Sequence, residues 1–521
     1  MRQYLYALGL VAIIIALGAC RNDFEFSPST GDLGFSKDTI YLDTVFTNIG
    51  SSTYNLRVYN NSDNDISIPS VRLERGDDSR YRLNVDGQAG KAFTNVEILA
   101  KDSIFVFVET TVDITEFAAT ATEFLYTDKI LFDEGADQQD VDLVTLIKDA
   151  VFLFPERTVV NGETITETLI LGSGEDAVEI EGFFLDNTQL NFTNEKPYVI
   201  YGYAAVPGGE TLTIDAGARV HFHAGSGLIV ANNGTLQVNG ALSTDLDLLE
   251  NEVIFEGDRL EPGFANVPGQ WGAIWLTDGS TANIISHATI RNATVGLLMD
   301  NNDGTTNPTL TLNGVQIYNS SVSGLLARTG HIVAENSVFG SSGQPSVQLT
   351  IGGNYDFKHC TIANYWNNSF RNTPALLINN YLELEDGSNF TQDLVQANFA
   401  NTIVFGSNST EFFLDPVPEA AFNYQFSNCL LRFGLSNPAN PDLFDFSNEA
   451  LYSGEIINMD PDFRNTQEED FIIGDNSAAN GQGDTTTASQ VPTDILGVDR
   501  TASPDLGAYQ HITFDSTRGN N

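Results

Sequence analysis

The chain has 521 residues, of which 41% are hydrophobic, so it exceeds one ordinary domain and can build a sizeable core. Asp and Glu outnumber Lys and Arg by 69 to 24, which gives a formal net charge of -45 at pH 7. This balance argues against nucleic acid and anionic membrane surfaces as partners, because phosphate binding requires a basic patch. An acidic surface keeps a protein dispersed, and it also suits divalent cations or a salty medium.

The N-terminal residues carry a short apolar run over 5–17, followed by Gly18-Ala19-Cys20. The run is too short to span a bilayer comfortably. Small residues before a Cys resemble the lipobox of bacterial lipoproteins, which implies a signal peptide over 1–19 and acylation of Cys20. Each buried CH2 of the acyl chains contributes about 0.8 kcal/mol, so the anchor is durable. The alternative is an ordinary secretory signal.

Acidic residues follow the Cys at Asp23 and Glu25. They resemble the surface-export signals of Bacteroidetes lipoproteins. We therefore expect a lipid-anchored protein of the outer membrane, exposed at the cell surface.

A tether over 20–37 leads to residues 38–150, where apolar and polar residues alternate in short segments separated by turn-forming clusters. The clearest segments are Tyr54–Tyr59, Ile66–Val71, Tyr81–Val85 and Ser103–Glu109. This spacing predicts a β-sandwich. The run VYNNSDNDISI at 58–68 resembles immunoglobulin-like domains, which implies a spacer or docking module without catalytic residues.

Residues 209–240 repeat one pattern every eight residues. Each repeat has two apolar residues around one intervening residue, and a Gly-rich or Asn-rich turn follows. The apolar pairs are Leu212 and Ile214, Val220 and Phe222, Leu228 and Val230, and Leu236 and Val238. Three such strands make a coil of 24 residues, which predicts a parallel β-helix over 151–455.

A second, longer repeat takes over after residue 271, with the form apolar, two variable, small or compact, one variable, apolar. Its six copies are 285–290, 312–317, 333–338, 357–362, 399–404 and 426–431. The residues two positions after the first five copies are Asn or Gly, which indicates a tight turn with a left-handed backbone. A second strand is expected in most coils.

Turns of Asn or Gly with inward ladders of Ile, Val and small residues resemble the right-handed parallel β-helix, or pectin-lyase-like, family. The closing segment 456–521, with Asp460-Pro-Asp-Phe463 and Asp505-Leu-Gly-Ala-Tyr509, resembles the C-terminal cap of secreted bacterial members. Together with the lipobox, the chain is similar to β-helix lipoproteins of Bacteroidetes. The resemblance implies a polysaccharide ligand, bound on the outer face of one sheet, where enzymes of this fold work. The fold alone does not fix an activity.

Two cysteines, Cys360 and Cys429, occupy the same inward position two copies apart. With strands about 4.8 Å apart, their separation is about 9.6 Å, beyond the limit of about 7 Å for a disulfide. We expect two buried free thiols.

The best acid–base candidates are Glu335 and His359 on adjacent copies, with Lys358 beside them. The alternative is an exposed ion pair without chemistry. The paired Asp residues of pectin hydrolases are missing from the sequence.

Four aromatic residues are expected to point outward at or near stacked positions: Tyr318, Phe339, Tyr365 and Trp366. They could form a platform for sugar rings. A loop or inserted segment packing over them explains them equally well.

The loop from Asp300 to Asn307 places oxygen ligands at Asp300, Asn302 and Asp303, which calcium accepts. It lacks the later bidentate Glu of an EF-hand loop, so an ordinary polar turn is the alternative. Calcium is the only cofactor that the sequence suggests.

The sequence therefore predicts an all-β protein, with an immunoglobulin-like sandwich followed by a right-handed parallel β-helix. The expected function is binding to a polysaccharide or extracellular matrix without catalysis, by a monomer held on the membrane through its lipid anchor. A polysaccharide lyase or glycosidase acting in the outer groove is the alternative, and a purely structural envelope role is a third.

Overall fold

The computed structural model describes residues 25–172, 177–436 and 438–514. Strands account for 48% of the structure and helices for 5%, which confirms the all-β prediction. The chain divides into two compact units, Met1–Asp149 and Ala150–Asn521. The predicted signal peptide and Cys20 lie outside the described residues. Within the described part, no helix is long and apolar enough to cross a membrane.

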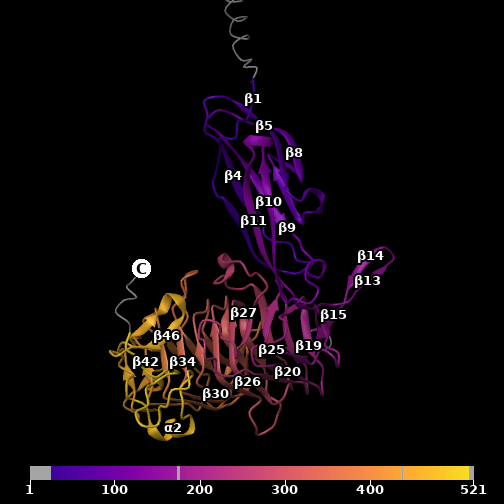
Figure 1. The fold of residues 1–521 in the computed structure, drawn as a ribbon. Coiled ribbons are helices and arrows are strands. Elements are labelled where there is room, and N and C mark those ends of the chain that lie inside the picture. The colour runs from indigo at the N-terminus through magenta and orange to yellow at the C-terminus, as the bar shows by residue number, and fades with distance from the viewer. Residues whose placement is uncertain (1–24, 173–176, 437, 515–521) are drawn as a thin grey trace, which may run out of the picture. The chain divides into compact units, whose positions relative to one another are not determined.

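The first unit contains two sheets (Figure 1). The five-stranded sheet consists of β2 (Leu33–Phe35), β4 (Tyr54–Asn60), β9 (Ser103–Thr110), β6 (Tyr81–Val85) and β7 (Gln88–Gly90). The six-stranded sheet consists of β1 (Ser27–Pro28), β5 (Ile66–Leu73), β10 (Glu123–Phe132), β11 (Gln139–Lys148), β3 (Thr39–Phe46) and β8 (Ala92–Ile98), which pairs with β5.

Both sheets contribute to one hydrophobic core, because alternate residues of each strand point inward. Leu56 and Val58 of β4 are fully buried, as are Val141 and Leu143 of β11. The four strands expected from the alternation all form. The predicted tether differs from expectation, because β1 and β2 lie within it and join the sheets.

The second unit is built from three columns of parallel strands, each strand pairing with the equivalent strand of the next winding (Figure 1). The first column contains β17 (Asn191–Phe192), β20 (Thr211–Asp215), β23 (Thr235–Asn239), β30 (His331–Glu335), β33 (Gly353–Lys358), β38 (Leu394–Ala400), β41 (Gln425–Ser427) and β43 (Tyr452–Ser453). The second contains β12 (Val151–Leu153), β18 (Tyr198–Ile200), β21 (Arg219–Phe222), β24 (Val253–Gly257), β31 (Val338–Phe339), β34 (Thr361–Asn364), β39 (Ile403–Gly406), β42 (Leu430–Leu431) and β44 (Ile456–Ile457).

Two long strands, β26 (Asn283–Arg291) and β28 (Leu310–Tyr318), run through both of these columns, which form one 19-stranded sheet. The third column is a separate 10-stranded sheet: β15 (Thr168–Leu171), β16 (Val178–Phe184), β19 (Tyr203–Val206), β22 (Gly227–Val230), β25 (Trp271–Leu276), β27 (Ala293–Asp300), β29 (Ser323–Arg328), β32 (Val347–Thr350), β35 (Leu376–Asn379) and β40 (Phe412–Asp415). Only β15 in that sheet pairs antiparallel.

Short hairpins and helices complete the described structure. The hairpin strands are β13 (Arg157–Val160) with β14 (Glu163–Thr166), β36 (Tyr381–Glu383) with β37 (Asn389–Thr391), and β45 (Phe463–Asn465) with β46 (Asp470–Ile473). The helices are α2 (Thr485–Gln490) and the 3-10 turns η1 (Gly76–Asp78), η2 (Ile114–Glu116), η3 (Gly135–Asp137), η5 (Pro262–Phe264), η6 (Pro441–Phe444) and η7 (Thr466–Glu468).

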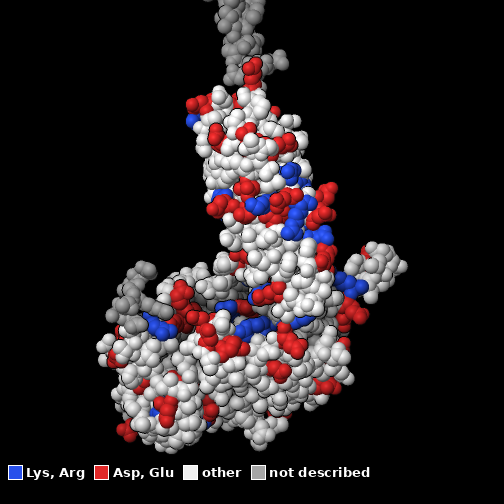
Figure 2. All heavy atoms as spheres, in the orientation of Figure 1, with Lys and Arg blue, Asp and Glu red and all other residues white. Residues whose placement is uncertain are grey.

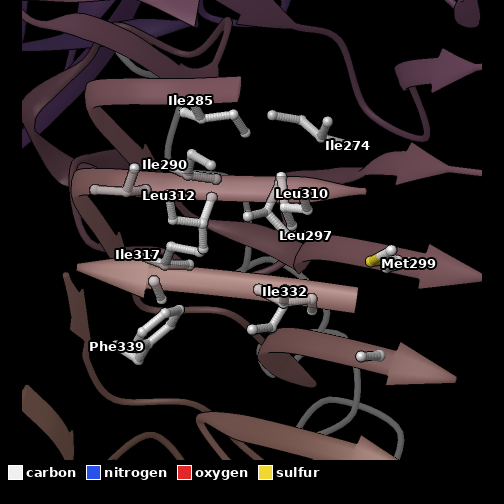
Figure 3. Close-up of a cluster of buried hydrophobic side chains, with 14 of the residues drawn as sticks. Ile274, Ile285, Ile290, Leu297, Met299, Leu310, Leu312, Ile317, Ile332 and Phe339 are labelled. Atoms are coloured by element: carbon white, nitrogen blue, oxygen red, sulfur yellow. The ribbon is translucent and has the colours of Figure 1, made fainter. Parts of the chain in front are cut away.

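The predicted registers hold for most windings. Leu212 pairs with Leu236, as the 24-residue coil requires. Ile285 pairs with Leu312, and the side chains of these windings point into one interior (Figure 3). Successive windings therefore bury their apolar faces only against each other.

The third copy of the longer repeat is shifted by one residue from the expected alignment. Ala334, and not Val333, pairs with Leu312 and Phe357, and Phe339 pairs with Ile317. The reason is that Val333 and Ala334 are adjacent apolar residues, so two registers satisfy the pattern. The correction turns Phe339 inward, where it is fully buried (Figure 3).

The corner between the first and second columns has a left-handed backbone in six windings. The residues there have positive φ values: His287, Gly314, Asn336, His359, Asn401 and Asn428. The sequence placed the left-handed turn later in the repeat, where only Asn292 and Asn319 have it. The positive φ values break the alternation of inward and outward side chains at the corner. The side chains of Asn336 and Asn401 can therefore contact the closing segment.

The closing segment lies along the outside of the second column. Its apolar residues pack on Val338, Ala363 and Leu430 of that column. The corner residues hold it: the Asn336 amide donates to the Thr493 carbonyl at 2.9 Å, and the Asn401 amide donates to the Asp484 carbonyl at 3.0 Å. The segment therefore covers a side of the stacked strands.

Both described cysteines are buried and free, as predicted. Thr402 lies between the two cysteines. Its hydroxyl accepts the Cys360 amide proton, and the next residue, Ile403, pairs with Leu430, which follows Cys429. Each thiol donates to a backbone carbonyl, Cys360 to Ala334 and Cys429 to Phe399.

Candidate binding cleft

A cleft of about 510 Å³ lies over the outer face of the second column, at β26 and β28. Its floor is formed by outward side chains of these strands, among them Thr289 and Gln316. One wall comes from the loop before β24. Another comes from the turn after β34 and from the closing segment around 464–472. Four segments far apart in the sequence thus meet at one site.

Three of the four aromatic residues expected outside line this cleft: Tyr318, Tyr365 and Trp366. The Tyr365 ring stacks on Phe471 of the closing segment, with centroids 6.1 Å apart. The Trp366 indole donates to the Ser369 hydroxyl at 2.9 Å and stays partly exposed. The fourth expected residue, Phe339, does not belong to the site, because its ring faces Phe357 in the interior.

Hydrogen bonds connect the floor of the cleft to a half-buried carboxylate, that of Glu252. The Gln316 side-chain oxygen accepts from the hydroxyls of Tyr318 and Tyr509, the latter at 3.2 Å. The Thr289 hydroxyl donates to Glu252 at 3.1 Å, and burial raises the pKa of Glu252. The floor is therefore a polar surface whose donors and acceptors are already oriented.

A second carboxylate, Glu469, enters from the closing segment. Its backbone is left-handed, with φ 57°, and its carboxylate accepts the Ser341 amide proton at 2.9 Å. Burial raises the pKa of Glu469 to about 7. Gly340 makes the approach possible, because a Cβ there would lie 2.5 Å from both the Glu469 carboxylate and the Tyr318 ring.

A ladder of charged residues on three consecutive windings adjoins the cleft. Glu256 lies between His221, at 3.6 Å, and Arg291, whose Nε donates to it at 2.7 Å. Burial would raise the pKa of Glu256, but His221 and Arg291 together lower it below the usual value. Sequence reasoning missed this ladder, because the irregular loop before β24 hides the alignment of Glu256 with His221.

The predicted acid–base group does not assemble. Lys358 lies 3.8 Å from Glu335 and 3.0 Å from Asp356 on the outer face of the first column. His359 turns away at the left-handed corner and is fully buried, with its Nε2 2.9 Å from the Asn401 amide. Burial and the nearby Arg500 lower the pKa of His359 to about 2, so its ring is neutral and closed to solvent.

The predicted calcium ligands have other partners. Asp300 pairs with Arg328 and accepts the Trp275 indole proton at 2.7 Å. Asp303 accepts from the Thr281 hydroxyl at 2.6 Å, and Asn302 accepts the Gly304 amide proton at 2.9 Å. An arginine on Asp300 opposes a cation there. Within the described ranges, no three His, Cys, Asp or Glu side chains gather as metal ligands.

Comparisons with known proteins leave the family open. No protein family model matches the chain, and no curated protein matches it. Among solved structures, a family 123 glycoside hydrolase from Clostridium perfringens, described for glycolipid glycan hydrolysis, aligns with 22% of this chain at 10% identity and a TM-score of 0.15. The aligned part covers 26% of that protein, and a likeness this low carries no argument about fold or function.

Proposed function

We propose that the protein is a lipid-anchored polysaccharide-binding protein that uses the cleft over the second column and performs no catalysis. The observation that carries the proposal is the cleft itself, in which Tyr318, Tyr365 and Trp366 lie beside oriented polar groups. Sugar rings offer apolar faces and hydroxyl rims, so aromatic planes next to hydrogen-bonding side chains are suited to bind them.

We further infer that the second unit is a right-handed parallel β-helix and that the first is an immunoglobulin-like β-sandwich. Three columns of parallel strands with stacked inward ladders support the former. Two sheets around one core support the latter. The first unit then serves as the spacer between the anchor and the binding unit.

The lipobox supports attachment to the outer membrane through Cys20. Replacing Cys20 with Ser should release the protein from the membrane fraction, because the acyl chains are its anchor. Tight membrane association of the Cys20→Ser protein would contradict this part of the proposal.

A glycan array read for both retention and product release tests the binding role. Trp366→Ala should weaken glycan retention about tenfold, since an aromatic contact contributes roughly 0.5–1.5 kcal/mol beyond its buried area. Phe390→Ala is the matched control, because Phe390 is an exposed aromatic on the β36–β37 hairpin and does not line the cleft. If the wild-type protein retained no glycan, the proposal would fail.

A glycosidase or lyase is the second candidate function. The observation in its favour is that Glu469, with its pKa raised to about 7, faces the same cleft as Glu252. A carboxylic acid that keeps its proton near neutral pH can act as a general acid. Release of shortened glycans by the wild type, lost in Glu469→Gln, would select this candidate over simple binding.

A further inference from the structure

The cleft carries more carboxylates than cations. Its lining contains two arginines, and each is already paired: Arg291 with Glu256 and Arg464 with Asp470. Three other carboxylates in the lining, Glu252, Glu468 and Glu469, form no ion pair with Lys or Arg in the described part of the chain. The lining therefore holds three carboxyl groups without a paired Lys or Arg among the described residues, and it gains negative charge as the pH rises through the pKa of Glu469, which burial raises to about 7.

A third arginine lies close by but is used for structure. Arg219 donates to the carbonyls of Leu249 and Glu252, at 2.8 and 2.7 Å. These bonds fix the loop before β24 that forms one wall of the cleft. Because its guanidinium already donates to backbone carbonyls, Arg219 does not bind the carboxylate of an acidic sugar.

Aromatic rings adjoin the unpaired carboxylates. The Glu469 carboxylate and the Tyr318 ring both lie close to Gly340, since a Cβ there would be 2.5 Å from each of them. Tyr365 and Trp366 lie on the same wall, and none of the Arg–aromatic contacts in the described residues involves these three rings. Phe471 packs against Tyr318 and Tyr365, so the Trp366 ring, which is partly exposed, is the one best placed to contact a ligand. An aromatic face beside carboxylates attracts ammonium groups through the ring quadrupole and through direct charge.

The rest of the protein reinforces this preference. The chain has a formal net charge of -45, and acidic side chains are spread over the face shown in Figure 2. A negative surface raises the local concentration of cations and repels polyanions such as uronic acid polymers.

We propose that the cleft selects glycans whose sugar units carry protonated amino groups, and that it rejects glycans built from uronic acids. This inference rests on the proposed function, because it names the ligand class of the same site. It narrows the polysaccharide ligand that the pectin-lyase-like resemblance implies to one chemical class.

The test uses the full chain and two matched ligands, glucosamine oligomers and the same oligomers with every amine acetylated. Acetylation removes the charge and keeps the sugar backbone. Glucosamine oligomers should bind about tenfold more tightly at low ionic strength, as expected for one close charge pair near a protein surface. Added salt should reduce the difference, because it screens partly exposed charges.

Two variants locate the effect. Glu469→Gln and Glu252→Gln should each lower the ratio of the affinity for glucosamine oligomers to the affinity for the acetylated oligomers, because each variant removes one carboxylate from the cleft. Glu385→Gln is the control. Glu385 is exposed on the β36–β37 turn, so this substitution removes the same charge at a position outside the cleft. An equal loss of preference in the control would overturn the assignment to the cleft.

The failures can be told apart. Equal binding of both oligomers, or tighter binding of oligogalacturonate, would overturn the charge selection and leave the polysaccharide-binding proposal standing. Retention of no glycan at all would remove both proposals. Binding of oligolysine with no binding of glucosamine oligomers would overturn the inference in favour of a basic peptide ligand.

Discussion

The carboxylate of Glu455 is buried beside Cys429, at the last turn of the stacked strands. Its Oε2 accepts the Cys429 amide proton at 3.1 Å, while Oε1 is buried without a partner in the described structure. Burial raises the pKa of Glu455 to about 8. The folded protein therefore holds a proton there that the unfolded chain releases at lower pH.

We predict that this proton makes stability fall as pH rises from about 4.5 to about 8, the usual and the folded pKa values of Glu455. Glu455→Gln should be more stable than the wild type by about 2–4 kcal/mol at pH 8 and nearly equal to it below pH 4.5. Urea denaturation across this pH range measures the difference. A constant difference at all pH values would contradict the assignment.

The two thiols give a second prediction at this scale. Burial raises the pKa of Cys360 to about 12 and that of Cys429 well above its usual value, so neither forms a thiolate at neutral pH. In the mature chain, a thiol reagent should find neither cysteine reactive in the native protein and both reactive after denaturation without reductant. Fast labelling of the native protein would show that the core opens.

Residue-level prediction from the sequence succeeded where the pattern allowed one register and failed where it allowed two. Cys360 and Cys429 follow strands with unambiguous apolar ends, and both lie where expected. Phe339 follows Val338, so either residue could end the repeat, and the wrong choice placed Phe339 on the surface. The acid–base candidates depended on the same choice, since the corrected register aligns Glu335 with Lys358 and leaves His359 at the corner.

At the scale of elements, the closing segment is attached through a few buried polar contacts. Arg500 is 1% exposed, and its guanidinium donates to the Asn336 side-chain oxygen at 2.9 Å and to the Gly507 and Ala508 carbonyls at 3.1 Å. The bond to Asn336 joins the segment to the corner between the first and second columns, and the two carbonyl bonds fix the segment's own backbone beside it.

Replacing Arg500 with Met should destabilise this attachment by about 2–4 kcal/mol, because three buried acceptors lose their donor. Limited proteolysis should then cut within the closing segment faster than in the wild type, while the stacked strands resist. Arg157→Met, at an exposed position in β13, should leave the cleavage rate unchanged. Equal cleavage of the Arg500 and Arg157 variants would show that Arg500 does not hold the segment.

The docking of the closing segment was beyond sequence reasoning. Its contacts join residues more than 80 positions apart, such as Asn401 with Asp484 and Asn336 with Arg500, and no periodic signal marks them. The stacked strands have such a signal, because each winding repeats the same inward positions. Consequently the floor of the cleft could be anticipated in part from Tyr318, and the wall bearing Glu469 could not.

At the scale of the whole molecule, the two units have separate hydrophobic cores. The core of the first unit runs from Leu33 to Ile147, and that of the second runs from Leu153 to Tyr452. The division between the units falls after Asp149, close to the boundary that the change of pattern indicated. Alternation and the octad repeat could locate these cores because both are periodic, short-range signals.

We predict that a fragment of residues 25–149 folds alone, because its two sheets bury a complete core. Thermal unfolding followed by circular dichroism should show one cooperative transition for the fragment. The full chain should show a matching transition together with a second one from the larger unit. A fragment without a cooperative transition would mean that the first unit depends on the rest of the chain.

The cleft is a composite of early and late parts of the chain. Glu252 and Tyr318 belong to the windings, whereas Glu469 and Tyr509 belong to the closing segment. Removal of the closing segment would take Glu469 and Tyr509 out of the cleft and would expose Val338, Ala363 and Leu430 of the second column. If the proposed function holds, ligand binding requires that the final sixty or so residues be present and docked, and a protease that removes them should abolish binding.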